Sequence, residues 1–390
     1  MRNSVSRLRI VLGNSSLAHY PEGGGHWTCF LQFFLGLHAL GHDVFWLEVL
    51  NSKGDALRDR QLIKVFFDRM RQYGVEERCI LLLKGNDAEP ITFETTKAFG
   101  QRAGESNEIV TTADLLWNFA SALRQPLLSS FKRRVLVDVD PGIWQVSALD
   151  WDMGQNDHDV FLTVGSKLRD IDCKVPSLGL PWHPFSPVIY LPMWEIAPDP
   201  GSQAPFTSVT QWNWGELWLG KRVLSAAKRD AYLQYVELPA RAGRPFKLAA
   251  NIHPNDQTGD RELLQRHQWT LVHPHEVAGS PATYQNYIKR SRAEICCPKP
   301  IYRDLKTGWL SDRSAGYLAT GRPVLAEDTG FSEHFPTGNG LLAFQNMEEA
   351  LAGVAEIDRN YAHHSHAARG FAEEFLDSRL CLPAMLAACG

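Results

Sequence analysis

The sequence predicts an α/β fold built from two Rossmann-like domains. Short apolar segments typical of buried strands alternate with helix-forming segments along most of the chain. The 390 residues are enough for two domains, each with its own core. A proline-rich segment at 180–205 divides the alternation, because proline interrupts helices and is excluded from central strands.

The first domain is expected over residues 1–190. A strand at 8–12 leads through a glycine-rich loop into a helix at 27–40, which is apolar on all sides, as expected of a helix buried under a sheet. The polar segment 85–110 matches no regular element. The remaining expected elements are strands at 44–47, 80–83, 135–139 and 160–164 and an amphipathic helix at 57–73.

An extended connection over 191–206 leads into the second domain, expected over 207–366. This domain should begin with a strand at 207–212, followed by a helix that ends near Pro239. Further strands are expected at 246–250, 270–272, 294–297 and 324–326. The terminal segment 367–390 has the pattern of an amphipathic helix.

The segment 308–331, GWLSDRSAGYLATGRPVLAEDTGF, has the features of a phosphate and sugar site. Ser311 can cap a short helix that ends at Gly321. The unpaired N–H groups at the start of such a helix favour an anion. The strand 324–326 follows, and the loop 327–331 lies at its carboxyl end, where open α/β sheets bind ligands.

This segment resembles the C-terminal domain of GT-B glycosyltransferases. The pattern of the resembling group runs as glycine, arginine, a short helix, A-x-G-x-P-V and an acidic loop, and Gly308, Arg313, 319–324 and 328–331 supply it in order. Retaining family 4 members have two glutamates here, and the corresponding positions hold Gly308 and Gly316. The resemblance implies two domains that face a cleft, a C-terminal helix that crosses back to the first domain, and a nucleotide-diphosphate sugar as co-substrate, with UDP the expected nucleotide.

The resemblance places most donor contacts in the second domain. Arg313 and Ser314 are expected to bind the diphosphate, and Asp312 is a candidate substitute for the missing ribose-binding glutamate. Lys228 is an alternative phosphate partner, although a surface-charge role is the preferred interpretation. The full set of expected donor-binding residues is Gly24, Gly25, His275, Val277, Asp312, Arg313, Ser314, Asp328, Thr329, Gly330 and Phe331.

Two residues of the first domain are candidate catalytic bases. His26 follows three glycines at the start of a helix, and the ordinary pKa of histidine suits general-base catalysis; the alternative is that it only packs or caps there. Asp140 follows the strand 135–139, on the same side as Asp138. Asp140 could act as the base, orient His26, or form a turn before Pro141.

These assignments predict a hexosyltransferase-like enzyme that transfers a sugar to an acceptor hydroxyl without a metal. Inversion is considered first, because the paired glutamates are absent, but retention stays open. The alternatives are a sugar-nucleotide 2-epimerase of the same fold and a noncatalytic nucleotide-sugar or glycan-binding protein. The acceptor is a saccharide, a lipid or a natural-product aglycone, and the segment 85–110 is expected near it.

Composition argues against several other partners. The formal net charge of -4 gives no basic surface of the kind that nucleic-acid proteins use. The seven cysteines show no zinc-site spacing, and His363, His364 and His366 lack a converging carboxylate, so neither a metal nor a cofactor is expected. No apolar run is long enough for a transmembrane segment, which predicts a cytoplasmic protein that is at most peripheral to the membrane.

Overall fold

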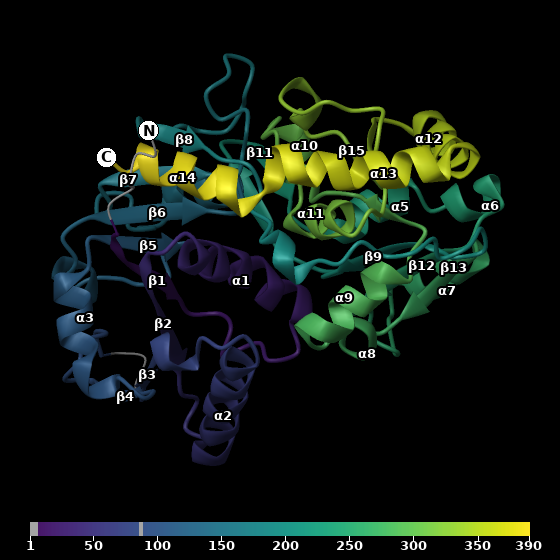
Figure 1. Cartoon of the computed structure of the whole chain (residues 1–390). Coiled ribbons are helices and arrows are strands. Elements are labelled where there is room, and N and C mark those ends of the chain that lie inside the picture. Colours follow the sequence, from purple (N-terminus) through teal and green to yellow (C-terminus); the bar gives the residue numbers. More distant parts are fainter. Residues whose placement is uncertain (1–6, 86–88) are drawn as a thin grey trace, which may run out of the picture.

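The computed structural model of the chain describes residues 7–85 and 89–390 and contains two large, mainly parallel sheets (Figure 1). The first sheet has the order β4-β3-β2-β1-β5-β6-β7-β8, and only β4 runs antiparallel to its neighbour. The second sheet has the order β13-β12-β9-β14-β15-β16, and all of its strands are parallel. The predicted α/β fold with two Rossmann-like halves is confirmed, and the domain limits at 190 and 206 stay predictions.

Strands and helices alternate within both halves, as parallel sheets require. The strands are β1 (Arg9–Asn14), β2 (Asp43–Asn51), β3 (Cys79–Lys84), β4 (Thr96–Phe99), β5 (Leu115–Phe119), β6 (Arg134–Asp138), β7 (Val160–Thr163), β8 (Trp182–Pro184), β9 (Phe206–Thr210), β10 (Glu216–Leu219), β11 (Arg222–Ser225), β12 (Phe246–Ala250), β13 (Trp269–Val272), β14 (Ala293–Cys296), β15 (Val324–Glu327) and β16 (Leu341–Phe344). The helices are α1 (Gly24–Ala39), α2 (Ala56–Gln72), α3 (Ser106–Thr112), α4 (Ile143–Asp150), α5 (Lys228–Gln234), α6 (Leu238–Ala242), α7 (Asp260–Arg266), α8 (Pro274–Ala278), α9 (Pro281–Lys289), α10 (Pro300–Asp304), α11 (Asp312–Ala319), α12 (Met347–Arg359), α13 (Tyr361–Phe371) and α14 (Ser378–Ala388).

The structure differs from the sequence-based prediction in several segments, among them the following three. The prediction omitted β5, a central strand whose five residues are all buried, so that it shows no polar alternation. The hairpin of β10 and β11 and the short helices α5 and α6 replace the single helix expected to end near Pro239. The polar segment 85–110 contains β4 and the start of α3, while its residues 86–88 lie outside the described residues.

The C-terminal helices join the two halves. In Figure 1 the yellow helices α13 and α14 run across the molecule, with α13 against α11 of the second half and α14 against α1 of the first. The close approach of α14 requires Gly36 of α1, where a Cβ would lie 2.5 Å from the Leu382 side chain. The predicted return of the C-terminal helix to the first domain is confirmed.

The connection between the halves is anchored at Trp194. The Gln32 side chain of α1 accepts hydrogen bonds from the Tyr190 N–H and the Trp194 indole N–H, at 2.7 and 3.2 Å. The Trp194 ring lies on α11 at Gly316, where a Cβ would come within 2.7 Å of the ring. Trp194 therefore occupies the space beside a helix position that carries a glutamate in retaining family 4 enzymes.

The second glycine of this pair, Gly308, is also held by close packing. Its φ is +70°, and a Cβ there would lie 2.3 Å from the Ser166 hydroxyl oxygen. Ser166 belongs to the first half and donates a hydrogen bond to the Gly308 carbonyl at 2.9 Å. Backbone conformation and packing therefore both favour glycine at this position.

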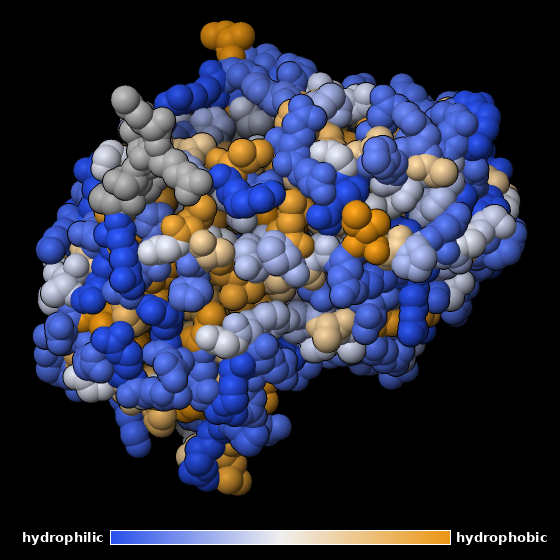
Figure 2. Space-filling view, viewed as in Figure 1, coloured by the Kyte–Doolittle hydropathy of each residue, from blue (hydrophilic) through white to orange (hydrophobic). Residues whose placement is uncertain are grey.

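The face shown in Figure 2 is mostly hydrophilic, with apolar side chains in scattered groups, as is usual for a folded domain. Among the described residues, none of the helices combines the length and the apolar character that a membrane crossing requires.

The packing at Gly316 predicts a stability difference between two glycine substitutions. We expect Gly316→Ala to lower the free energy of unfolding by about 1–3 kcal/mol, because its methyl group would overlap the buried Trp194 ring. Gly370→Ala in α13 is the matched control, since a Cβ there meets nothing within 4 Å. The control should gain about 0.4–1 kcal/mol. Urea unfolding curves of both variants measure the difference, and equal midpoints would contradict this account of Gly316.

Candidate functional site

A cavity of about 270 Å³ lies between the carboxyl ends of the two sheets. The first half contributes the loop after β1 and the residue Asp140, which follows β6. The second half contributes Lys228, Lys299 and the first turn of α11. Of the predicted site residues, the structure places Gly24, Gly25, His26, Asp140, Asp312 and Arg313 in the cavity lining.

Two glycines of the glycine-rich loop lie where the two halves approach too closely for a larger side chain. A Cβ at Gly24 would lie 2.2 Å from the Ser280 carbonyl oxygen, between α8 and α9. A Cβ at Gly25 would lie 3.2 Å from the Tyr284 ring of α9. These glycines were predicted to let a ligand approach the backbone, and the structure shows that they let the second half of the molecule approach it.

His26 is partly buried at the start of α1, and one of its ring nitrogens makes a hydrogen bond. Its Nε2 lies 2.8 Å from the Ser16 hydroxyl oxygen, and that hydroxyl donates to the Asn14 side-chain oxygen at 2.6 Å. Because Ser16 donates its proton to Asn14, His26 must donate through Nε2, which leaves the lone pair on Nδ1. Burial lowers the pKa of His26 and outweighs the opposite effect of Asp312 and Asp140. At neutral pH the imidazole is therefore a neutral base.

Asp140 lines the cavity, and its carboxylate bonds to residues of the second half. Its carboxylate accepts from the Lys299 ammonium at 2.9 Å and from the Tyr302 hydroxyl. Burial alone would raise the pKa of Asp140, but the Lys299 charge and these bonds lower it below its usual value. Within the described residues no hydrogen bond joins Asp140 to His26, so the alternative in which Asp140 orients His26 is not seen in this structure.

Asp138, the other acid of this strand, is buried away from the cavity. It accepts hydrogen bonds from the Gln145 amide and the Thr163 hydroxyl, both at 2.8 Å. Burial raises the pKa of Asp138 to about 6. Asp138 therefore supports the end of β6, while Asp140 lines the cavity.

Lys228, at the start of α5, is a buried cation that no acid neutralises directly. In the part of the chain that the structure describes, its ammonium has no hydrogen-bond or carboxylate partner and lies 5.6 Å from the Trp309 ring centroid. Burial lowers the pKa of Lys228 to about 8, and the Arg313 charge adds to the effect. The preferred sequence interpretation, a surface charge, is wrong for Lys228. Lys228 is buried because it lies in the wall of the cavity, and the residues next to it in the sequence do not indicate this burial.

Arg313 is occupied by protein contacts. Its Nε donates to the Glu294 carboxylate at 2.6 Å, and a terminal nitrogen donates to the Val209 carbonyl at 2.8 Å. Glu294 is fully buried, so the pair is shielded from solvent. Arg313 adds positive charge to the cavity wall, but these donors are already used. Its neighbour Asp312 is exposed and lines the cavity.

The other predicted donor residues lie outside the cavity lining. The Asp328 carboxylate accepts from the Gly330 N–H of its own loop at 2.9 Å, and the Thr329 hydroxyl donates to the Trp309 carbonyl at 2.7 Å, so both side chains are engaged by protein contacts. His275 lies near the rim, with Nε2 3.5 Å from the Tyr20 hydroxyl. The remaining residues, Val277, Ser314, Gly330 and Phe331, are buried or partly buried beside the site.

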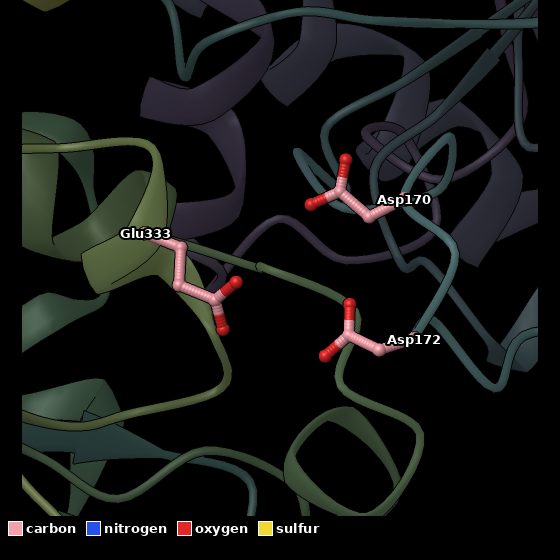
Figure 3. A group of neighbouring side chains, drawn as sticks. All are labelled: Asp170, Asp172 and Glu333. Carbon is pink, nitrogen blue, oxygen red and sulfur yellow. The ribbon is translucent and has the colours of Figure 1, made fainter.

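One group of three acids within the described residues converges closely enough to resemble a metal site: Asp170, Asp172 and Glu333 (Figure 3). The Lys167 ammonium contacts Glu333 and lies 3.0 Å from Asp172 and 4.0 Å from Asp170. The Lys306 ammonium is 2.9 Å from Asp172. Since Glu333 belongs to the second half and Lys167 to the first, these charges form an ionic contact across the interface.

A second cavity, of about 130 Å³, adjoins the first. The two cavities share His26, Asp140, Trp309 and Asp312. The remaining walls of the second cavity are Cys29, Phe30, Phe33, Val139, Val164, Phe185, Pro187 and Val188. A cavity that contains a buried lysine therefore adjoins, at His26, a second cavity whose remaining walls are mainly apolar.

Comparison with known proteins identifies the fold. No protein-family model matches the sequence, and no curated protein matches it. An alpha-glucosyltransferase solved with UDP and a 13-mer DNA containing an HMU base has a TM-score of 0.61 at 12% identity, covering 98% of this chain and 99% of that one. HepE of Anabaena, solved with UDP and glucose, has a TM-score of 0.56 at 11% identity, covering 98% and 99%.

Sucrose-phosphate synthase of Thermosynechococcus elongatus has a TM-score of 0.52 at 11% identity, covering 97% of this chain and 98% of that one. These neighbours confirm the predicted GT-B fold. Because one of them was solved with DNA, the expectation that this chain has no nucleic-acid partner stays a prediction.

Lys228 should make anion binding depend on pH. A lysine with a pKa of about 8 is charged at pH 7 and mostly neutral at pH 9, and a diphosphate binds the charged form. We expect the affinity for UDP to fall about tenfold from pH 7 to pH 9. Lys228→Met should bind UDP weakly at both values and lose this dependence, while the exposed Lys221→Met should retain it. Titration calorimetry measures the UDP affinity of each variant at pH 7 and pH 9. An unchanged pH dependence in Lys228→Met would contradict the assignment of Lys228 as the anion-binding group.

Proposed function

We propose that this protein is a glycosyltransferase that moves a sugar from a UDP-sugar to an acceptor hydroxyl. The observation that carries the proposal is the buried, unneutralised Lys228 in a cavity between two Rossmann-like halves. Structures of the same fold were solved with UDP, which favours this nucleotide over others. A hexose is the proposed sugar.

The donor diphosphate would lie against Lys228 and the first turn of α11. Lys228 supplies a charge that no carboxylate of the described chain pairs with, and a helix N-terminus favours an anion. Arg313 belongs to this turn, and its pairing with Glu294 fixes its position in the cavity wall. As the bond to the sugar breaks, the leaving diphosphate gains charge, which these fixed positive groups would stabilise. We propose that this stabilisation takes the place of a divalent metal.

His26 is the proposed base. Among the described residues its Nδ1 has no hydrogen-bond partner, and the ring lines both cavities, at the place where donor and acceptor would meet. The acceptor oxygen would attack the anomeric carbon while its proton moves to Nδ1, and the diphosphate would leave with the electron pair of the broken bond. Asp140 is less suited to this step because Lys299 and Tyr302 hold its carboxylate. We assign it to fixing the two halves around the cavity.

A single displacement of this kind would invert the anomeric carbon. Lys228 lines only the first cavity, and the apolar walls of the second cavity lie beyond His26, which favours attack from the side opposite to the diphosphate. Proton NMR of the fresh product determines the outcome through the anomeric coupling constant. Inversion is expected, and a product with the configuration of the donor would reject His26 as the base of a single displacement.

The function is tested by binding before turnover. UDP, GDP, dTDP and ADP are titrated calorimetrically, and UDP-sugars are then incubated with the protein and followed by NMR. We expect UDP to bind most tightly and UDP-glucose or another UDP-hexose to be hydrolysed slowly without an acceptor. Release of an isomerised sugar nucleotide would indicate a 2-epimerase, and binding without any turnover would indicate a noncatalytic protein.

His26→Ala should lower the rate of transfer or donor hydrolysis by about 10²–10⁴, the usual contribution of a general base. The Kd for UDP should stay close to that of the unmodified protein, because the proposed role of His26 concerns the proton of the attacking group. His366→Ala is the matched control, since His366 is exposed on α13. Full activity of His26→Ala would reject the assignment of His26 as the base, but it would not affect the assignment of the donor site.

A further inference from the structure

The apolar cavity beyond His26 has the size of a single aromatic ring. Its volume is about 130 Å³. A protein cavity of about 150 Å³ with apolar walls is known to take up benzene. The cavity beside His26 is therefore close to the size that one aromatic ring requires.

The walls of this cavity favour an aromatic occupant over a sugar. Phe30, Phe33 and Phe185 are at most 9% exposed, and the Phe33 and Phe185 rings meet edge to face at 6.3 Å. A ring placed among them can make the edge-to-face contacts that aromatic groups prefer. A pyranose would bury several hydroxyl groups against these walls, and each hydroxyl without a partner would cost free energy. Polar groups are confined to one end of the cavity, at His26, Asp140 and Asp312, with the Cys29 thiol nearby.

We propose that the acceptor is a small phenol whose ring fills this cavity and whose hydroxyl faces His26. The inference rests on the proposed glycosyltransferase function and adds the chemical class of the acceptor. The polar end of the cavity is also the place where it meets the first cavity, so a ring inserted between the phenylalanines directs its hydroxyl toward the donor sugar.

The chemistry of the proton transfer agrees with a phenol. Burial lowers the pKa of His26, which makes the imidazole a weaker base than a free histidine. A phenol ionises near pH 10, about six units below water, so its proton is transferred more readily to such a base. The phenol oxygen forms the new bond to the anomeric carbon, the bond from that carbon to the diphosphate breaks, and the proton goes to Nδ1 of His26. The step needs no further reactant.

The test compares aromatic and non-aromatic acceptors with one UDP-sugar that the protein hydrolyses. Phenol, 4-methylphenol, cyclohexanol, methyl glucoside and 1-octanol are supplied in turn, and the product is quantified by chromatography and mass spectrometry. We expect aryl glycoside from phenol and 4-methylphenol, and at least tenfold lower kcat/KM for the other three. Equal or better use of methyl glucoside or 1-octanol would overturn the proposal.

Two variants assign the effect to the cavity. Val188→Phe places a ring in the cavity, and we expect it to raise the KM for phenol at least tenfold. The matched Val223→Phe is on the exposed hairpin strand β11 and should leave this KM unchanged. Phe185→Ala enlarges the cavity and should shift preference from phenol toward 2-naphthol. An unchanged phenol KM in both cavity variants would overturn the assignment of the cavity, and UDP titration of each variant verifies that it is folded.

The outcomes separate this inference from the proposed function. If UDP neither binds nor is released from a UDP-sugar, the proposed function fails. If a UDP-sugar is hydrolysed or transferred but phenols are not glycosylated, the proposed function stands and only the acceptor inference fails.

Discussion

The carboxylate of Asp140 is the contact on which the cavity depends. It reaches from the end of β6 to Lys299 and Tyr302 of the second half, so it fixes the distance between the two sheet edges. It also provides negative charge in a space where Lys299 and Lys228 repel each other. Without Asp140 the Lys299 ammonium would lose its ion-pair partner and Lys228 a nearby negative charge. The Asp140 carboxylate thus holds the two cavity walls together and lowers the electrostatic cost of burying the Lys228 charge.

The rest of the interface supports this contact through close packing. One hydrophobic core continues from the first half, through Phe34 and Trp194, to Leu318 and Leu376. The glycines of the β1 loop let α8 and α9 approach, and Lys167 adds an ionic contact among acids of both halves. A core that crosses the interface resists opening more strongly than a polar contact between domains would. The geometry between His26 and Lys228 is accordingly set by packing before any ligand arrives.

The sequence was sufficient to predict the fold, because strands and helices differ in hydrophobic period and proline marks the connection. It failed at β5, whose buried run has no alternation to detect. It found His26 and Asp140 because both follow strand ends, where parallel sheets present ligand groups.

It did not identify Lys228, because the burial of a lysine depends on elements that are distant in the chain. The loop at 328–331 was assigned to the donor because of its place after a strand. In the structure the Gly330 N–H donates to the Asp328 carboxylate, so this side chain bonds within its own loop. Such a contact depends on the orientation of the side chain, which a sequence pattern does not contain.

The packing at Gly308 and Gly316 has an evolutionary consequence. Each position is matched to a partner elsewhere in the chain, Ser166 for the first glycine and Trp194 for the second. A glutamate introduced at either position by a single substitution would overlap that partner. A two-glutamate arrangement would therefore require compensating substitutions at Ser166 and Trp194, which lie far along the chain from the glycines that they contact.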